Sequence, residues 1–179
     1  MAERSARTER SGARRAGIVA AARALLEAEG AAGLSMRRLA ERLSIQAPSL
    51  YKHFPGKAAL EAAIVASVLE EQADLFERAL AAAPGEPLAA LARAYRDYAL
   101  RHPHLYRLVN AGALPRELLP AGLEARAAAP LIAAAGGVPG AARAAWAFAH
   151  GMVMLELDGR FPEGADLDAA WRAGVAAFR

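Results

Sequence analysis

The chain has 179 residues and no cysteine. It is long enough to bury one substantial core, or a small domain joined to a larger one. The lack of cysteine excludes disulfides, thiolate zinc sites and cysteine nucleophiles. No run of eighteen apolar residues is free of charge, and no apolar leader follows Met1. We therefore expect a soluble, cytoplasmic protein without a membrane partner.

The net charge of +3 is unevenly distributed. Residues 1–60 hold eleven Lys and Arg against five Asp and Glu, whereas residues 61–179 hold eleven against fourteen. Basic side chains that neutralise phosphates release condensed counterions, so a basic N-terminal part predicts binding to a polyanion. A merely solvated basic tail would carry the same charge.

Alanine and leucine dominate, and apolar residues recur every three or four positions, so we predict an all-α fold. A first helix is expected at 12–29, after a short basic arm. Ser35 is expected to cap a second, two-turn helix with its hydroxyl. A three-residue turn, 44–46, then leads to a short helix at 47–54, with Pro48 in its first turn.

Pro55 and Gly56 end the third helix, and a long amphipathic helix runs from Lys57 to about Ala83. Clusters of Pro and Gly divide the rest into about five more helices. We predict an N-terminal domain of residues 1–56 and a C-terminal helical domain of residues 57–179. The long helix is expected to serve both, which predicts a stiff boundary.

Two short helices joined by a three-residue turn, the second with polar residues outside its apolar stripe, are typical of a helix-turn-helix. The second helix of this motif lies in the major groove and presents its N-terminal residues to base edges. Short side chains allow that approach, so the predicted base contacts are Ala47, Pro48 and Ser49.

Residues with donor groups flank this helix, where the phosphates would lie. These predicted phosphate contacts are Tyr51, Lys52, His53 and Lys57. At the start of the preceding helix, Ser35 and the adjacent amides can hold a phosphate, and Arg37 and Arg38 would strengthen that site.

The run Leu39-Ala-Glu-Arg-Leu-Ser-Ile-Gln-Ala-Pro-Ser-Leu-Tyr-Lys-His-Phe-Pro-Gly-Lys57 resembles the DNA-binding signature of the TetR family of bacterial repressors. The resemblance covers about residues 14–68. It implies base contacts at 47–49, phosphate contacts from Tyr51 and Lys57, and a mixed role for His53. Ser44 stands where the family often has glycine, and a left-handed backbone there would cost serine about 1 kcal/mol.

Each of these residues taken singly has a structural interpretation. Tyr51 can be a packing residue, His53 a solvent-facing helix residue, and Lys57 a helix position chosen for solubility. The basic arm, with Arg4, Arg7, Arg10, Arg14 and Arg15, can insert into a minor groove, but a disordered solubilising tail is the simpler interpretation.

A single reading head of this size rarely holds a specific operator, so the sequence predicts a homodimer on two half-sites. The expected surface is formed by the last two long helices, at about 141–158 and 165–178, in an isologous four-helix contact. Their apolar faces include Phe148, Val153, Leu157, Trp171 and Val175.

The segment from Trp146 to Gly151, followed by 155–161, resembles the C-terminal domain of a TetR subgroup named for a Trp, His and Gly signature. That resemblance implies a regulatory domain. We predict a pocket for a small apolar effector; packing in the core is the alternative for each residue of its lining. The predicted lining residues are Tyr95, Tyr98, Tyr106, Trp146, His150 and Met154.

Enzymatic and metal chemistry have weak support in the sequence. His102, His104, His150 and Glu156 lack the one-turn spacing of metal-binding histidines, so no metal site is predicted. There is no glycine-rich phosphate loop and no serine elbow, and we predict no catalytic residue and no cofactor. The sequence predicts a dimeric repressor that an effector releases from DNA. The alternatives are a regulator without an effector, or a helical enzyme or lipid-binding protein with a vestigial head.

Overall fold

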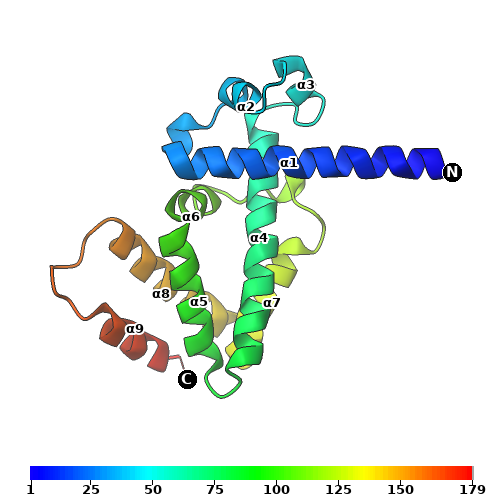
Figure 1. Cartoon of the computed structure of the whole chain (residues 1–179). Coiled ribbons are helices and arrows are strands. Elements are labelled where there is room, and N and C mark those ends of the chain that lie inside the picture. The colour runs from blue at the N-terminus through cyan, green and yellow to red at the C-terminus, as the bar shows by residue number, and fades with distance from the viewer. Residues whose placement is uncertain (179) are drawn as a thin grey trace. The chain divides into compact units, whose positions relative to one another are not determined.

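The computed structural model describes the backbone of residues 1–178 and the side chains of residue 1 and residues 9–178. Every regular element in this part of the chain is helical, which confirms the predicted fold class (Figure 1). The elements in chain order are α1 (Ala2–Gly33), α2 (Met36–Arg42), α3 (Ala47–Tyr51), α4 (Lys57–Ala82), α5 (Pro87–Arg101), α6 (Pro103–Val109), the 3-10 turn η1 (Arg116–Leu118), α7 (Leu123–Ala134), α8 (Pro139–Leu157) and α9 (Leu167–Ala176). In the described part, no helix is both long and apolar enough to cross a bilayer.

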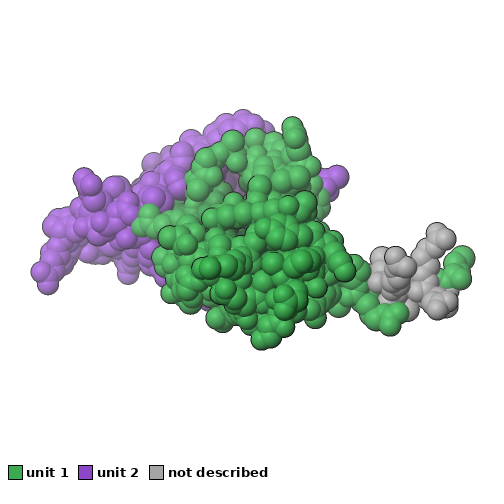
Figure 2. All heavy atoms as spheres, turned by 90° about the horizontal axis from the view of Figure 1, so that it is seen from above, with its two compact units in different colours: residues 1–68, 104–120 green, residues 69–103, 121–179 purple. Residues whose placement is uncertain are grey.

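The chain forms two compact units, which Figure 2 colours separately. Unit 1 comprises residues 1–68 and 104–120, and unit 2 comprises residues 69–103 and 121–179. The division falls inside α4, so this one helix supplies residues to both units. The predicted domains of residues 1–56 and 57–179 stay a prediction.

In unit 1, α2 and α3 lie on one side of α1, and α6 lies on the other (Figure 1). Apart from the Tyr106 hydroxyl the core of this unit is apolar, and its large side chains are at most 2% exposed: Ile18, Leu25, Leu26, Leu39, Leu50, Phe54, Leu60, Ile64 and Tyr106. Burial of each such side chain contributes roughly 1.5–3 kcal/mol. Leu50 and Phe54 therefore anchor α3 from its inner face, as the apolar stripe predicted.

The expected basic arm is instead part of α1. Arg10, Arg14 and Arg15 all lie in this helix, which begins well before the predicted start at Gly12. Good helix formers before Gly12 explain the longer helix, because alanine, arginine and glutamate favour it. The expectation of a disordered tail is wrong for Arg10, Arg14 and Arg15; Arg4 and Arg7 lie outside the described side chains.

The C-terminal part of α1 packs against α6. Gly30 adopts φ 69° and ψ −177°, a backbone conformation that only glycine adopts readily, and His104 packs against it. A carboxylate oxygen of Glu27 accepts a hydrogen bond of 2.8 Å from the Leu105 amide. Amides in the first turn of a helix have no partner within the helix, so Glu27 satisfies one of them.

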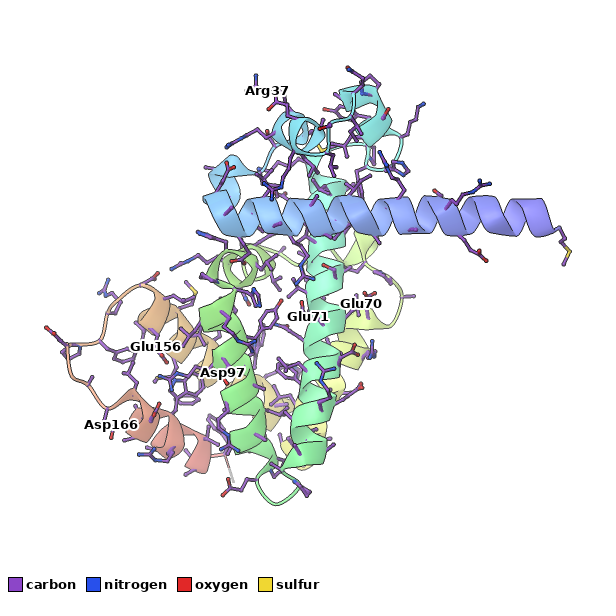
Figure 3. The ribbon with its side chains drawn as sticks, viewed as in Figure 1. Arg37, Glu70, Glu71, Asp97, Glu156 and Asp166 are labelled. Carbon is purple, nitrogen blue, oxygen red and sulfur yellow. The ribbon has the colours of Figure 1, made fainter. Side chains whose placement is uncertain are left out.

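In unit 2, α5 packs against α7, α8 and α9. Arg96 of α5 ties the C-terminal helices together, because its Nε lies 2.9 Å from Glu156 of α8 and its Nη1 binds Asp168 of α9. The indole of Trp171 donates to the other oxygen of Glu156. The Asp166 carboxylate caps α9 by accepting a hydrogen bond from the Ala169 amide. Figure 3 labels Glu156, near the C-terminal end of α8, and Asp166, just before the first turn of α9.

This packing changes the interpretation of the last two helices. Val153, Trp171 and Val175 were predicted to face a second copy, but they are at most 8% exposed within a single chain. They pack inward because α9 folds onto α5, and Phe148 contacts Trp171 edge-on at 5.6 Å. These three side chains are therefore used by the packing within one chain, and the prediction that they face a second copy is wrong.

Candidate nucleic-acid interface

Ser35 caps α2 as the sequence predicts. Its backbone is extended, with φ −139° and ψ 154°, and its hydroxyl accepts a hydrogen bond of 3.3 Å from the Arg38 amide. Such a cap stabilises a helix by about 1 kcal/mol. The cap uses the hydroxyl only as an acceptor, so its O–H can still donate to a phosphate at this end of α2.

The turn between α2 and α3 is a Schellman motif centred on Ser44. The Ile45 amide donates to the Ala40 carbonyl and the Ser44 amide to the Glu41 carbonyl, both at 3.0 Å. Ser44 has φ 52°, the only positive φ of a non-glycine residue in the described part of the chain. Ser44 therefore adopts the left-handed backbone that was expected at this position. A serine in this conformation carries backbone strain that a glycine would not.

Ser44→Gly is therefore expected to raise the free energy of unfolding by about 0.5–1 kcal/mol, because glycine adopts a positive φ without a Cβ clash. Urea denaturation followed by circular dichroism measures this change. Ser11→Gly, in an exposed helical position of α1, serves as the control and should destabilise. Destabilisation by Ser44→Gly would mean that the serine hydroxyl offsets the strain.

Helix α3 presents the predicted reading residues outward. Pro48 and Lys52 are exposed, and Tyr51 is 50% exposed, whereas Leu50 on the opposite face is fully buried. Ala47, Ser49 and His53 are partly exposed. The helix ends at Tyr51 rather than at the predicted Phe54, because Pro55 disfavours helical backbone in the residue before it. The Phe54 amide still donates a hydrogen bond to the Leu50 carbonyl. Short polar and apolar groups thus stand at its N-terminal end, free of the core.

The basic residues of this surface differ in how firmly they are held. Arg37 is 84% exposed, and Figure 3 shows it standing out from α2 on the side away from α1. It makes one long ion pair, 3.7 Å, with Glu41. Arg38 instead binds Glu29 of α1 and is only 45% exposed. Arg37 is therefore the better placed of the two for a phosphate, while Arg38 joins α2 to α1.

Lys57 at the start of α4 is 47% exposed, and its Nζ lies 3.6 Å from Glu61. An exposed pair of this kind is worth less than about 1 kcal/mol, so a phosphate can compete for the lysine. Lys57→Ala should weaken binding to all duplexes alike, and the slope of log affinity against log salt should fall by about 0.9. Fluorescence anisotropy at several salt concentrations measures both.

The control for this prediction is Arg78→Ala, which removes an exposed positive charge from the unit 2 part of the same helix. It should leave the salt slope unchanged. A Lys57→Ala protein with the slope of the unaltered chain would remove Lys57 from the set of phosphate contacts.

Arg15 was not singled out as part of the reading head, yet it contacts the end of α3. Its Nη1 donates to the His53 carbonyl oxygen at 2.9 Å, and its guanidinium lies 4.2 Å from the centre of the Phe54 ring. The helical register could have revealed it. Arg15 precedes Ile18 and Val19 by three and four positions, so it shares their buried face.

The residues predicted to line a pocket are only partly brought together. Tyr95 and Tyr98 are buried on α5: Tyr98 donates to Glu71 of α4 at 3.1 Å, and Tyr95 lies 6.3 Å from the Phe76 ring. Figure 3 shows Glu71 between these two helices. Their hydroxyl and ring contacts fix the tyrosines against α4.

The other four predicted residues are placed differently. On α8, Trp146 is 49% exposed and its ring lies 6.4 Å from His150, while Met154 is half-buried one turn further on. Tyr106 is buried in α6, which belongs to unit 1. The aromatic residues therefore do not form one lining set within unit 2.

Gln72 is an interior polar residue that the sequence did not single out. It is 8% exposed on α4, and no hydrogen bond to its amide is found among the described residues. No fully buried side-chain nitrogen or oxygen in this part of the chain lacks a partner, so the amide must reach accessible space. The sequence feature that could have revealed it is a glutamine on an otherwise apolar face of a helix.

The charged cluster on α5, α8 and α9 shifts two pKa values. Burial by itself would lower the pKa of Arg96, but the hydrogen bonds that Arg96 donates to Asp168 and Glu156, with the attraction of their charges, outweigh burial and raise it. The hydrogen bond from Arg96 lowers the pKa of Asp168. Both groups are thus charged at neutral pH, and their role is to hold α9 in place rather than to exchange protons.

Comparison with known proteins tests the functional interpretation. Residues 18–64 match the family model described as bacterial regulatory proteins of the tetR family, and residues 88–178, half of the chain, match the tetracyclin repressor-like C-terminal domain. The chain belongs to the TetR family. Its members are DNA-binding transcriptional regulators, which are not enzymes.

Individual relatives of this TetR-family protein agree. The HTH-type transcriptional regulator Rv0681 of Mycobacterium tuberculosis is 32% identical over 157 residues, 81% of this chain and 71% of the relative. The regulator YobS of Bacillus subtilis is 31% identical over 90 residues, and that match spans only 47% of its length. The structure of the multidrug binding protein EbrR complexed with imidazole is 25% identical, with a TM-score of 0.64 over 92% of this chain and 94% of EbrR.

Proposed function

We propose that this TetR-family protein is a homodimeric repressor that acts in the bacterial cytoplasm on a palindromic operator and leaves it when a small apolar effector binds. The observation that carries the proposal is the two-sided character of α3. Its inner face is fixed by Leu50 and Phe54, while Pro48, Tyr51 and Lys52 are exposed. A helix held in this way can enter the major groove as a rigid reading element.

We assign the base contacts to Ala47, Pro48 and Ser49, at the free N-terminal end of α3. A methyl group and a proline ring suit a thymine methyl group, and a hydroxyl can donate to or accept from a base edge. The phosphate contacts are assigned to Arg37, Tyr51, Lys52, His53 and Lys57. Arg38 supports α2 through its ion pair with Glu29, whereas Ser35 caps α2 as an acceptor and can also donate its O–H to a phosphate.

Ser49→Ala is expected to change the preferred base at one position of each half-site and to leave the other positions unchanged, because only one hydroxyl is lost. A loss of discrimination of about 1–3 kcal/mol at that position is typical of one base contact. Selection from a random duplex library, with the unaltered chain and the variant in parallel, measures the effect. A uniformly weaker but otherwise identical preference would mean that Ser49 does not read a base.

We assign the dimer contact to the outer face of α8. Leu155 is 43% exposed there and follows Gly151 by one turn on the same face, whereas Trp146, 49% exposed, is nine positions before Leu155 and lies on the opposite side of the helix. Apart from the backbone of its own helix and its chain neighbours, no atom of the described residues lies within 4 Å of a Cβ built on Gly151, so a second backbone has room to approach. Two-fold pairing would also give the two reading heads that a palindrome needs.

Leu155→Glu tests this contact, with Leu118→Glu as the control, because Leu118 is also an exposed leucine, 56% against 43%, and lies in η1. Sedimentation equilibrium should show a dimer for the unaltered chain and the control, and a monomer for Leu155→Glu. A dimeric Leu155→Glu protein would place the contact elsewhere.

For the effector we propose the interior of unit 2, between α4 and α5, where Gln72, Tyr95 and Tyr98 are largely buried. An apolar interior with a few polar groups is the usual composition of a small-molecule site. Trp146, His150 and Gly151 support assignment of the C-terminal domain to the Trp-His-Gly subgroup. The likeness to a multidrug binding protein also favours an effector.

An effector should raise the melting temperature in proportion to the logarithm of its concentration, and it should release the operator. A panel of metabolites and drugs, screened by thermal shift, can find one. Gln72→Leu should then reduce the shift, whereas Gln46→Leu, at an exposed position before α3, should not. A panel without hits, together with undiminished operator binding in cell extract, would favour the alternative of a regulator without an effector.

Release is expected to involve α4, because this one helix supplies residues to both units without a break. Half-sites lie about 34 Å apart, or a multiple of that, on one face of the duplex. A shift of α4 by a few ångströms would change the separation of the two heads and so weaken binding. Structures of the dimer with and without effector that show the same separation would reject this route.

A further inference from the structure

Arg15 of α1 contacts the C-terminal end of the reading helix. Arg15 donates from Nη1 to the His53 carbonyl oxygen at 2.9 Å, and its guanidinium lies 4.2 Å from the centre of the Phe54 ring. Phe54 itself is fully buried. One residue therefore contacts both the backbone and the last apolar anchor at this end of α3.

This end of α3 needs such a contact. The helix has only five residues, too few to be stable alone. His53 follows Tyr51, the last residue of α3, by two positions, and carbonyls at and just after a helix end lack partners within the helix. Pro55 provides no amide for them. A charged donor satisfies one of these carbonyls more strongly than a neutral one would. The guanidinium also gains from lying against an aromatic ring.

We propose that Arg15 is a positioning residue for DNA reading: it fixes the orientation of α3 relative to α1 and does not itself bind a phosphate. Through this contact it sets the angle at which residues 47–49 meet the bases. The inference rests on the proposed sequence-specific binding, since a helix that reads no bases needs no fixed angle.

Arg14 provides the matched comparison. It is the neighbouring arginine on α1, about 100° around the helix from Arg15, and both residues are exposed. No hydrogen bond or ion pair of Arg14 is found among the described residues. Arg14→Met and Arg15→Met remove the same charge and retain a long side chain, but only the second removes a contact with α3.

Arg15→Met is expected to weaken binding to the duplex selected by the unaltered chain about tenfold, the cost of a charge-assisted hydrogen bond. Binding to sonicated random DNA should change much less, and the salt slope should stay as in the unaltered chain. Arg15→Lys, which keeps the charge and one donor, should recover part of the loss. Anisotropy titrations of the variants and the unaltered chain on both duplexes measure these quantities.

The contact can also be tested in the free protein. Amide hydrogen exchange in residues 50–56 should be faster in Arg15→Met than in Arg14→Met, while exchange in α5 and α8 stays unchanged. This readout holds whether or not the chain selects an operator. If the unaltered chain showed no preference among duplexes while exchange were faster in Arg15→Met, the proposed function would be contradicted. The contact between Arg15 and the end of α3 would still be supported.

Three results would overturn the inference. A fall of the salt slope by about 0.9 in Arg15→Met would identify a direct phosphate contact. An affinity loss no larger than that of Arg14→Met would mean that the contact has no effect on reading. Unchanged exchange in residues 50–56 would mean that Arg15 does not hold the end of α3.

Discussion

Phe54→Ala is expected to abolish operator binding, with a loss of affinity of about a hundredfold or more, because it removes the anchor of the reading helix. The ring is fully buried and lies under the Arg15 guanidinium. Truncation of a buried phenylalanine costs about 3–5 kcal/mol, a large fraction of the stability of a small domain. The head would then populate states in which α3 is not docked.

Two measurements separate this effect from a lost DNA contact. Both tryptophans lie in unit 2, so their fluorescence should report an almost unchanged unit 2, whereas amide exchange in residues 47–54 should become much faster. Tyr51→Ala is the control on the same helix. Tyr51 is 50% exposed, so its loss should reduce affinity and leave exchange nearly unaltered. A Phe54→Ala head as stable as the Tyr51→Ala head would refute the anchor role.

The sequence predicted unit 1 well because local signals agreed there with the packing. Ser35 precedes a helix and caps it, Ser44 occupies a left-handed position, and Leu50 and Phe54 fall on one helix face. Each of these features depends on residues within a few positions in the chain. Caps, turns and helical stripes are therefore readable without knowledge of the tertiary structure.

Contacts between distant segments were not readable in the same way. Arg15 and His53 are 38 positions apart, so no local pattern pairs them. Arg15 was assigned to a basic arm on charge alone, although its helical register matched Ile18 and Val19. Charge indicates a preference for phosphate, but it does not exclude a carbonyl of the protein itself.

The last two helices show a second limit of periodicity. The apolar face with Val153, Trp171 and Val175 was recognised, but periodicity cannot tell an internal partner from a second copy. The structure places α5 against that face. A clue lay in Gly174, because the Phe148 ring packs where its Cβ would be, and only a glycine accommodates that approach.

Glu156→Ala is expected to lower the free energy of unfolding of unit 2 by about 3 kcal/mol, because it leaves the buried Trp171 indole without an acceptor and the partly buried Arg96 without one of its two carboxylates. The carboxylate is 6% exposed and binds both Arg96 and the Trp171 indole. Arg96 retains 21% exposure, so water offsets part of the cost. Chemical denaturation followed by tryptophan fluorescence measures the change, since Trp171 is one of the two donors.

Asp168→Ala is the matched control, because it removes the other carboxylate of Arg96 from a position 71% exposed to water. Its effect should be much smaller than that of Glu156→Ala. It should also depend on pH: Arg96 lowers the pKa of Asp168, so the stabilisation is present at neutral pH and disappears as the pH falls through that lowered pKa. The difference between the unaltered chain and Asp168→Ala should therefore vanish in acid.

A double variant distinguishes an unpaired charge from lost packing. Arg96→Met combined with Glu156→Leu replaces the buried pair by apolar side chains of similar length, and it should recover much of the stability lost in Glu156→Ala. The Trp171 indole would still lack its acceptor, so recovery should be incomplete. If the double variant were as unstable as Glu156→Ala, the cost would lie in how α9 packs on α5, and the charged cluster would be a consequence of that packing rather than its cause.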